Sequence, residues 1–544
     1  MSSVVCSHVS FAWPDGTPLF AGLSLSVGDG RTGLVASNGA GKSALLKLIA
    51  GELAPTAGSI TVDGTLGYLP QSLPFVAEKT VSELLGIAPV VEALDALADG
   101  HSDDAVFTAI GDDWDVEERA RAQLDRLGLD HVALTRRLGS LSGGEVVTIG
   151  LAGQLLRRPG VLLLDEPTNN LGADARHRLD AALDEFTGCL LLVSHDRVLL
   201  DRMDRIAELR NGEIHYYGGN YTSFTTAVDE ARQAAENAVR NAEQRLKREK
   251  RDRQLARERA ARRSATAART VKDAGLPRIV AGAMKRRAQQ SAGRLDDVSA
   301  ARVDDARARL DEAERMLRDD DTLALDLPHT DVPAGRNILT LSNIRVSRGR
   351  RVLLGDVALS VRGPERIALT GPNGAGKSTL LRIIGGGLRP DAGTVARADG
   401  RVAYLSQRLD LLDPQRTVAE CLAAFAPSLT ATRRMHLLAR FLFRGSRIHL
   451  PVSALSGGER LRATLACVLY AEPAPHLLLL DEPTNNLDLV SVGQLQSALT
   501  AYRGALIVVS HDERFLDELG IDRWLRLSGG YLQESAHQQP PGTR

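Results

Sequence analysis

Two glycine-rich segments of this chain carry the residue types that bind phosphate groups. Residues 36–43 read Ala-Ser-Asn-Gly-Ala-Gly-Lys-Ser, and residues 371–378 read Gly-Pro-Asn-Gly-Ala-Gly-Lys-Ser. The glycines let backbone N–H groups curl around phosphate oxygens at the start of a helix, whose dipole favours anions. The lysine adds a point charge for the outer phosphates, and the serine hydroxyl can ligate Mg²⁺. The predicted cofactor-binding residues are Ala36, Ser37, Asn38, Gly39, Ala40, Gly41, Lys42, Ser43, Ala44, Gly371, Pro372, Asn373, Gly374, Ala375, Gly376, Lys377, Ser378 and Thr379.

An acidic pair follows each loop at the end of an apolar run. The first pair is Asp165-Glu166 and the second is Asp481-Glu482. Each aspartate would hold the metal, directly or through water, together with the loop serine. Each glutamate is placed to orient or deprotonate an attacking water. A glycine-rich turn after a strand is often only a turn, but the Lys-Ser pair and the downstream Asp-Glu pair argue against that interpretation. We predict hydrolysis of a phosphoanhydride bond at both places.

The same order of motifs occurs twice, offset by about 315–335 residues. In each copy a glutamine, a Leu-Ser-Gly-Gly-Glu segment, an acidic pair and a histidine follow the loop. From the loop serine to the glutamine is 28 residues in the first copy and 29 in the second, and from the aspartate to the histidine is 30 in both. So many matches in one order and register indicate a duplication.

The Leu-Ser-Gly-Gly-Glu segments resemble the signature of ATP-binding-cassette proteins. The resemblance covers residues 1–222 and 336–535, and it implies an α/β fold of two P-loop NTPase domains, here called the first and second cassette, with ATP and Mg²⁺ as cofactors. In that family the signature of one cassette closes over the nucleotide of the other. Lys42 would then share a site with Ser456, Gly457 and Gly458, and Lys377 would share one with Ser142, Gly143 and Gly144.

Two further residues of each copy gain a role from this resemblance. Gln71 and Gln407 correspond to glutamines that sense Mg²⁺ and water, whereas His195 and His511 correspond to histidines that touch the γ-phosphate. A lone histidine is usually structural, but a duplicated Ser-His-Asp, 30 residues past the acidic pair, favours the catalytic role.

The first cassette departs from the family pattern more than the second. Its phosphate loop begins with Ala36, where the second cassette has Gly371. Ala44 stands where the second cassette has Thr379, so the first loop lacks that hydroxyl group. Gly172 stands where the second cassette has Asp488, an aspartate that communicates across the dimer in the family. For adenine stacking, the first cassette offers Phe11 or Trp13, whereas the aligned stretch 346–348 offers only Arg348. Both acidic pairs are present, so we expect two active but unequal sites.

The composition fits an ordinary globular protein of more than one domain. The chain has 544 residues, 43% hydrophobic and 25% charged, and its apolar runs are short enough to be buried parallel strands. No run approaches the ~18 residues that cross a bilayer, and the residues before Phe11 lack a signal pattern. The four cysteines are far apart, which favours single buried thiols over a disulfide or metal framework. We expect a cytoplasmic protein.

The segment between the cassettes, residues 223–335, has a helical pattern of its own. Small and apolar residues recur at three and four, and Gly275-Leu-Pro277 interrupts the pattern. We predict a long antiparallel α-helical coiled-coil linker, with a first helix of about 45 residues, a tip near 270–284 and a disordered tail at 536–544. The recurring positions are Val228, Ala231, Ala235, Ala238 and Ala242, and Val303, Ala306, Leu310, Ala313 and Leu317.

Charge distinguishes this linker from the rest of the chain. Residues 240–294 hold 18 Lys/Arg against five Asp/Glu, a net of +13, although the whole chain has a net charge of −1. One sign concentrated in this way favours a polyanion, here RNA, over a solvated spacer. The layout resembles the ABC-F family, soluble twin-cassette ATPases that act on the ribosome with their linker toward the peptidyl-transferase centre.

The resemblance to the ABC-F family implies a set of partners and leaves several functions open. It implies ribosomal RNA and possibly tRNA as partners, no membrane or membrane-protein partner, and a monomer whose cassettes dimerise within the chain. We expect antibiotic resistance by ribosomal protection. The alternatives are a housekeeping role in translation or ribosome assembly, the ATPase subunit of a drug exporter, and a DNA-directed cassette ATPase. The glutamine and the signature are 70 residues apart in the first cassette and 48 apart in the second. This difference is too small for the larger arm insertion found in the translational-throttle branch of the ABC-F family.

Overall fold

The structure is a computed structural model, and it describes residues 2–71, 77–168, 171, 173–273, 298, 300–313, 327, 330–349, 351–372, 374–398, 401–443, 445–485 and 487–535. Contacts within the chain divide it into two units. One unit comprises Met1–Tyr221 with Thr322–Arg544, and the other comprises Thr222–Asp321. The first unit holds both cassettes.

The first cassette combines a six-stranded sheet of order β5-β6-β7-β3-β8-β9 with a three-stranded antiparallel sheet of order β2-β1-β4. The first five strands of the larger sheet are parallel and β9 is antiparallel to β8. The strands are β1 (Ser3–Ala12), β2 (Pro18–Val27), β3 (Gly30–Val35), β4 (Ala57–Asp63), β5 (Leu66–Leu69), β6 (Val161–Asp165), β7 (Cys189–Val193), β8 (Arg205–Arg210) and β9 (Glu213–Gly218). The helices are α1 (Lys42–Ile49), α2 (Val81–Leu85), α3 (Ala88–Ala98), α4 (Asp104–Ile110), α5 (Val116–Arg126), α6 (Gly143–Leu156), α7 (Ala173–Asp184) and α8 (Arg197–Leu200).

The second cassette repeats this arrangement, with sheets of order β14-β15-β16-β12-β17-β18 and β11-β10-β13. The strands are β10 (Asn337–Arg348), β11 (Arg351–Arg362), β12 (Arg366–Thr370), β13 (Ala392–Arg397), β14 (Val402–Leu405), β15 (Leu477–Asp481), β16 (Ala505–Val509), β17 (Arg523–Ser528) and β18 (Tyr531–Glu534). The helices are α11 (Lys377–Ile384), α12 (Val418–Phe425), α13 (Ala431–Arg440), α14 (Gly457–Leu469), α15 (Leu489–Ala501) and α16 (Glu513–Glu518).

Apolar runs form the central strands of both large sheets. Every position of β6, β7, β15 and β16 is buried, as expected for parallel strands covered on both faces. Parallel pairing aligns the carboxyl ends of neighbouring strands: Asp165 pairs with Val193, and Asp481 pairs with Val509. The residues that follow these four strands therefore lie together at one edge of each sheet, where ligands bind in open α/β sheets.

The longer spacing in the first cassette folds into two extra helices. Helices α3 and α4 pack against each other. Phe107 of α4 and Trp114 lie with ring centroids 6.4 Å apart, and both are exposed. The extra residues thus form a small helical hairpin of the kind the spacing left room for.

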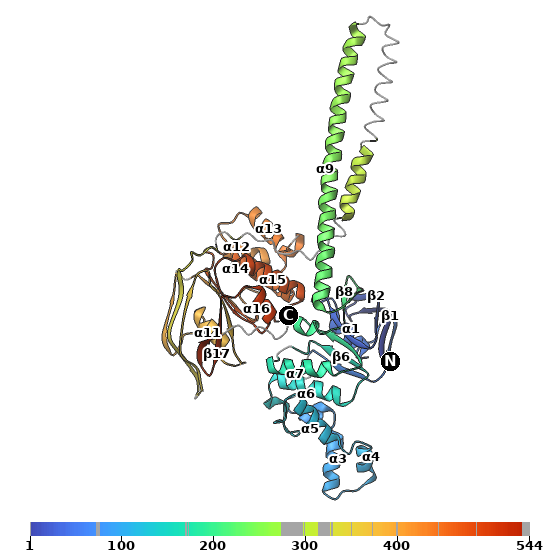
Figure 1. Cartoon of the computed structure of the whole chain (residues 1–544), viewed down its shortest axis with the longest axis vertical. Helices are drawn as coiled ribbons and strands as arrows, with labels where there is room; N and C mark the ends of the chain where they lie inside the picture. The colour runs from blue at the N-terminus through green and yellow to red at the C-terminus, as the bar shows by residue number, and fades with distance from the viewer. Residues whose placement is uncertain are drawn as a thin grey trace, which may run out of the picture. The chain divides into compact units, whose positions relative to one another are not determined.

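The second unit is dominated by α9 (Tyr221–Asp273), the long green helix of Figure 1. Its 53 residues exceed the predicted 45 and correspond to about 80 Å at 1.5 Å per residue. Residues 300–313 are also helical, and Ala306 is buried there. Residues 270–273 of the predicted tip belong to α9, and the rest of it, with Leu276, Ile279 and Val280, lies outside the described residues.

The shielded face of α9 differs from the predicted one. Val228, Ala235 and Ala242 are half-buried as predicted, but Ala231 and Ala238 are exposed. Between residues 228 and 253 the shielded positions, apart from Glu236, alternate steps of four and three, the 3.5-residue spacing typical of coiled coils. They are Val228, Arg232, Ala235, Val239, Ala242, Leu246, Glu249 and Arg253. The prediction erred because it selected small residues, whereas arginine and glutamate stems can cover an apolar face with their charge outside. Pairing of two helices as a coiled coil remains a prediction.

Two predictions drawn from composition can be compared with the structure. None of the helices in the described part of the chain is long and apolar enough to cross a membrane. Cys6, Cys189, Cys421 and Cys467 are all buried and unbridged, as predicted.

Candidate functional site

Both phosphate loops connect a central strand to a helix in the same way. The loop after β3 leads into α1 and the loop after β12 leads into α11, and the helices begin at Lys42 and Lys377. Gly41 and Gly376, just before these lysines, have φ of 100° and 104°. A side chain would be strained in that left-handed region, and a Cβ on Gly41 would approach Phe20 to 2.6 Å. Glycine is therefore required where the backbone turns its N–H groups toward a ligand.

The loop lysines are buried and hydrogen-bonded to their own loops. Lys42 donates to the carbonyl oxygen of Ala36 at 2.9 Å, and Lys377 donates to that of Gly371 at 2.7 Å. Burial lowers the pKa of both ammonium groups, and nearby carboxylates, first Glu166 for Lys42, oppose the shift. The first loop has Ala36 where the second has Gly371, and the bond from the lysine to the loop is kept because its acceptor is a backbone carbonyl oxygen.

Each acidic pair ends a buried strand and is followed by a backbone turn that side chains rarely adopt. Glu166 and Glu482 have φ of 51° and 48°. Their N–H groups donate to Val193 and Val509, the last residues of the adjoining strands, at 2.8 Å in both cases. Left-handed backbone at a residue other than glycine costs about 1–3 kcal/mol and often marks a functional position. This bond holds both glutamates in the same strained conformation.

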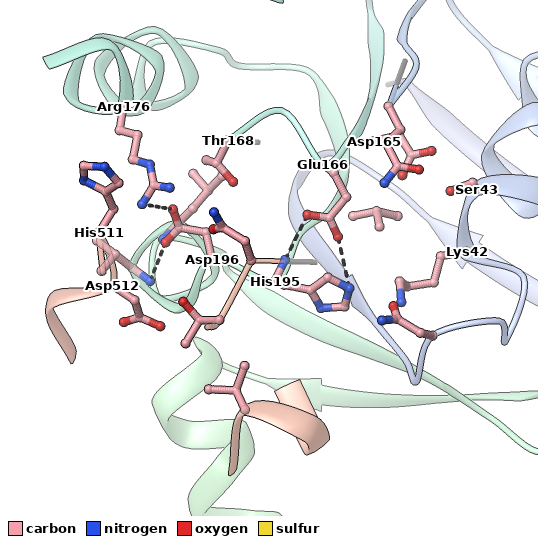
Figure 2. A pocket seen from close by; sticks show the side chains of 18 of the residues that line it. Lys42, Ser43, Asp165, Glu166, Thr168, Arg176, His195, Asp196, His511 and Asp512 are labelled. Carbon is pink, nitrogen blue, oxygen red and sulfur yellow. Dashed lines mark hydrogen bonds and ion pairs between the residues drawn. The ribbon is translucent and has the colours of Figure 1, made fainter. Parts of the chain in front are cut away.

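Each of these glutamates faces the predicted histidine of its own cassette. The backbone N–H of His195 donates to Glu166 Oε2 at 3.3 Å, and His195 Nε2 lies 3.3 Å from Glu166 Oε1. His511 and Glu482 show the same two distances. The four residues predicted to be catalytic therefore form two matching pairs (Figure 2 for the first).

The titration of these pairs is set mainly by burial. Burial raises the pKa of Glu166 and of Glu482, against the opposing charges of Lys42 and Lys377. Arg176, from the first cassette, also lowers the pKa of Glu482. Burial lowers the pKa of His195 to about 3 and that of His511 to about 4, so both rings are neutral at pH 7. A neutral ring can donate or accept a proton beside the glutamate.

The loop serines and strand-end aspartates fit a small divalent cation. Asp165 Oδ1 is buried and has no hydrogen-bond partner among the described residues, and the Ser43 hydroxyl bonds the same carboxyl group. Ser378 Oγ donates to Asp481 Oδ1 at 3.0 Å. Mg²⁺ is commonly held by one or two protein oxygens together with phosphate oxygens and water. An unpartnered carboxylate oxygen beside a serine suits that coordination.

A tyrosine distinguishes the two aspartates. Tyr404 donates from its hydroxyl to Asp481 Oδ2 at 2.9 Å. Its counterpart Tyr68 has a buried hydroxyl without a hydrogen-bond partner in the described part of the chain. The second aspartate is thus oriented by a protein donor that the first lacks.

A cavity of about 790 Å³ contains the first set of predicted residues. It is lined by Lys42, Ser43, Gln71, Asp165, Glu166 and His195, by Trp13, and by residues of the second cassette that include Thr484, Asn485, Val492, His511, Asp512 and Glu513. Trp13 meets Phe11 edge to face, with centroids 5.3 Å apart, and is the more exposed of the two. Figure 2 shows this cavity with side chains from both cassettes.

A cavity of about 360 Å³ contains the second set. It is lined by Lys377, Ser378, Thr379, Gln407, Asp481, Glu482, His511 and Arg348, and by Leu171 and Arg176 of the first cassette. Asn373 and Gly172 lie outside the described residues. Of the described linings, neither includes the signature residues, so the pairing of each signature with the opposite loop remains a prediction.

The signature segments cap the helices that follow them. Ser142 is the N-cap of α6 and Ser456 is the N-cap of α14. Each serine side chain accepts from the backbone N–H of the glutamate three residues later, whose side chain accepts from the backbone N–H of the serine. The two differ in their support: Glu145 lies 3.4 Å from His131, whereas Glu459 is paired with Arg447. The serine and glutamate of the Leu-Ser-Gly-Gly-Glu segments therefore have a local structural role as caps, and the first two residues of each Ser-Gly-Gly run are exposed at the helix start.

Side chains of the two cassettes also bond to each other. Asp488 accepts from the backbone N–H of Asn38, in the first phosphate loop, at 2.7 Å, while its other oxygen caps α15 through Ser491. The buried Arg197 donates to Glu518 at 2.8 Å. These bonds tie the first nucleotide site to the second cassette.

Sequence reasoning missed two contributors to these sites. Arg176 reaches both cavities, and Tyr404 bonds the strand-end aspartate Asp481. Asp488 was expected to act across the cassettes and does bond the opposite loop, but its partner Asn38 was not predicted. Aligning the two copies residue by residue would have flagged Arg176, because its counterpart is Val492.

Comparisons with known proteins place these features in a family. The family model described as "ABC transporter" matches residues 20–169 and 354–485. The tylosin resistance ATP-binding protein TlrC of Streptomyces fradiae is 36% identical over 90% of this chain and 91% of its own length. The ATP-binding protein Uup of Escherichia coli is 31% identical over 97% of this chain and 81% of its own length.

A solved structure shares the fold. A crystal structure of archaeal ribosome recycling factor aABCE1 with the ribosomal stalk protein aP1 gives a TM-score of 0.59 at 20% identity, over 97% of this chain and 89% of the solved one. At this identity the likeness shows a shared fold.

Proposed function

This chain belongs to the ABC-F family of ATP-binding-cassette proteins and is an ATPase, and from this premise we propose that it binds the ribosome and protects it from an antibiotic. Residues 1–222 and 336–535 act as the two ATP-driven cassettes, and residues 223–335 act as the ribosome-directed linker. The protein works in the cytoplasm, as a monomer whose cassettes close on each other.

The linker carries this proposal. Helix α9 has 53 residues, and its residues 240–273 hold 13 Lys/Arg against five Asp/Glu, a net of +8 in a chain of net charge −1. Arg248, for example, is 83% exposed. Exposed arginines on a long helix neutralise phosphates of folded RNA and gain affinity from counterion release. Helix α9 and the helical residues 300–313, both parts of the linker, would pair through their shielded faces as an antiparallel coiled coil.

The cassettes supply the energy. Two ATP molecules would sit on the phosphate loops, with Ser43 and Asp165 holding one Mg²⁺ and Ser378 and Asp481 the other. The metal ion adds positive charge to the outer phosphates. Glu166 and Glu482 then orient or deprotonate the attacking water, and the paired histidines hold that geometry beside the γ-phosphate. Closing each signature over the opposite nucleotide would couple ATP binding to the linker.

Resistance is the favoured role within the family. The alignment with the relative whose name states tylosin resistance covers 90% of this chain and 91% of that relative, so it includes both cassettes and the segment between them. The large Arg excess over Lys in this chain agrees with a GC-rich source. A housekeeping role in translation or ribosome assembly would use the same cassettes and linker, and it predicts a different outcome in the experiment below.

Ribosome pelleting and drug-inhibited translation test this function. The Glu166→Gln, Glu482→Gln double variant should pellet with ribosomes in ATP, and the wild type should restore translation stalled by a macrolide or lincosamide. A Lys42→Ala, Lys377→Ala variant serves as the matched control that cannot hold ATP. Absence of the double variant from the ribosomal pellet contradicts the ribosome assignment. Pelleting without rescue by any drug class tested favours the housekeeping alternative.

The linker should divide its work between tip and flanks. Replacing Leu276, Ile279 and Val280 with alanine should abolish protection while ribosome binding stays nearly intact. Neutralising Arg286 and Arg287 should weaken binding and flatten its salt dependence, because each lost phosphate contact removes about one released counterion. Binding measured at several salt concentrations separates the two. Loss of binding in the tip variant, with none in the arginine variant at any salt, would contradict this division.

A further inference from the structure

Arg176 lies between the two nucleotide sites. It belongs to the first turn of α7 in the first cassette, yet it lines the cavity of the second site together with Lys377, Ser378 and Glu482. It also reaches the edge of the first cavity. Figure 2 shows its guanidinium beside His511, and a dashed line joins it to Asp196.

The guanidinium has donor capacity to spare. Its Nη1 lies 3.5 Å from Asp196 Oδ2, at the long end for an ion pair between charged groups. Its Nε is buried and has no hydrogen-bond partner within the described residues. An arginine offers five N–H donors in a planar fork, which matches the spacing of phosphate oxygens. A buried donor without an acceptor is costly, so an acceptor that arrives with a ligand would relieve it.

The counterpart of Arg176 in the second cassette cannot act in this way. The acidic pairs are 316 residues apart, as are the histidines, so Arg176 corresponds to Val492. Val492 lies near the start of α15, is 3% exposed and lines the first cavity. The second cassette thus presents an aliphatic side chain to the first site, whereas the first cassette presents a cation to the second.

We propose that Arg176 is a phosphate-contacting residue that the first cassette supplies in trans to the nucleotide of the second site. It would donate to the outer phosphate oxygens beside Lys377 as negative charge develops there, which is how arginines supplied by a neighbouring domain assist phosphoryl transfer. The first site has no such cation at Val492. This inference rests on the proposed role of the phosphate loops, and it makes the second site dependent on the first cassette for its charge.

Single-site enzymes test the proposal. Glu166→Gln leaves the second site to hydrolyse ATP, and Glu482→Gln leaves the first. Adding Arg176→Gln should reduce kcat at least tenfold in the Glu166→Gln enzyme, and at least tenfold more than in the Glu482→Gln enzyme. Arg176→Lys should restore part of the loss, because it keeps the charge but not the fork. The melting temperature of each variant shows whether it is folded.

The outcomes separate this inference from the proposed function. Equal losses at both sites, or no loss at the second, overturn the role of Arg176. A loss that Arg176→Lys does not recover, with a lowered melting temperature, also overturns it and assigns Arg176 to the structure of α7. Should both single-carboxylate variants keep full turnover, the assignment of the catalytic glutamates itself is wrong.

Discussion

The two nucleotide sites have matching glutamate–histidine pairs, but the residues that the opposite cassette adds to each site differ. Glu166 with His195 and Glu482 with His511 show identical distances of 3.3 Å. The opposite cassette, however, adds Asp488 at the first loop and Arg176 at the second site. The two copies have thus kept the glutamate–histidine pairs, while the residues that meet across the cassettes have diverged.

The surroundings of the two sites differ in size as well as in charge. The first cavity measures about 790 Å³ and the second about 360 Å³. Asp512 and Glu513 of the second cassette line only the first cavity, whereas Arg176 of the first cassette lines both cavities and is the cation that crosses into the second. A triphosphate carries several negative charges, so cations across the cassettes favour its charge and carboxylates oppose it. The size of the two cavities and the charges that cross between the cassettes therefore favour unequal sites, in addition to the loop substitutions that suggested them.

Removing both catalytic carboxylates should have the largest effect. The Glu166→Gln, Glu482→Gln double variant should hydrolyse ATP at least ~10²-fold slower, because general-base assistance is worth that much. It should still bind ATP, since Lys42 and Lys377 are untouched. Phosphate release and equilibrium binding of a fluorescent ATP analogue measure the two properties. Normal turnover would show that these glutamates do not assist the attacking water.

The cross-cassette bond of Asp488 should have the next largest effect, confined to one site. Asp488→Asn keeps one oxygen for the cap of α15 but places an amide group against the N–H of Asn38. Loss of a charged hydrogen bond costs about 1.5 kcal/mol or more, which corresponds to roughly tenfold in rate or affinity. The Glu482→Gln background, in which the first site alone works, should show it. An equal effect in the Glu166→Gln background would contradict the comparison.

The single carboxylate variants should differ from each other by less. Glu166→Gln should retain more ATPase activity than Glu482→Gln, by roughly fivefold, because one additional phosphate contact is worth about 1 kcal/mol. Steady-state kinetics of the two enzymes under matched conditions give the ratio. Indistinguishable kinetics would mean that the differences across the cassettes have no functional weight.

The two tyrosines provide the smallest and most direct comparison. Tyr404→Phe removes a hydrogen bond to Asp481 and should cost about 1 kcal/mol, or about 2–4 °C in the melting temperature of a domain of this size. Tyr68→Phe removes a buried hydroxyl that has no partner in the described chain, so it should be neutral or slightly stabilising. Calorimetry of both variants tests this, and similar losses would place a partner on Tyr68.

Much of the fold and site was readable from sequence because it is local. A glycine-rich loop before a lysine, an apolar run before an acidic pair and a serine three residues before a glutamate each determine a short segment by its own backbone geometry. The repeat then doubled every such signal. Motif order alone was enough to predict which side chains gather at the carboxyl ends of β6 and β7.

The remainder depends on contacts between segments far apart in sequence. Nothing near Arg176 or Tyr404 indicates what they face, because their neighbours come from another cassette or strand. The face of α9 was misread for a related reason: Arg232 and Val239 are shielded, whereas Ala231 and Ala238 are not. The prediction placed the shielded face of α9 on its small residues, whereas the shielded face in the structure follows a 3.5-residue spacing.

The start of α9 gives the linker a mechanical property. Arg514, which pairs with Asp201 at 3.0 Å, lies 5.9 Å from the ring centroid of Tyr221, the first residue of the helix. Over the ~80 Å length expected of 53 residues, each degree of tilt at Tyr221 displaces Asp273 by about 1.4 Å. For a helix that stays straight, a rotation of a few degrees at Tyr221 would thus displace Asp273 by several ångströms, so length alone makes α9 suited to magnify small rotations.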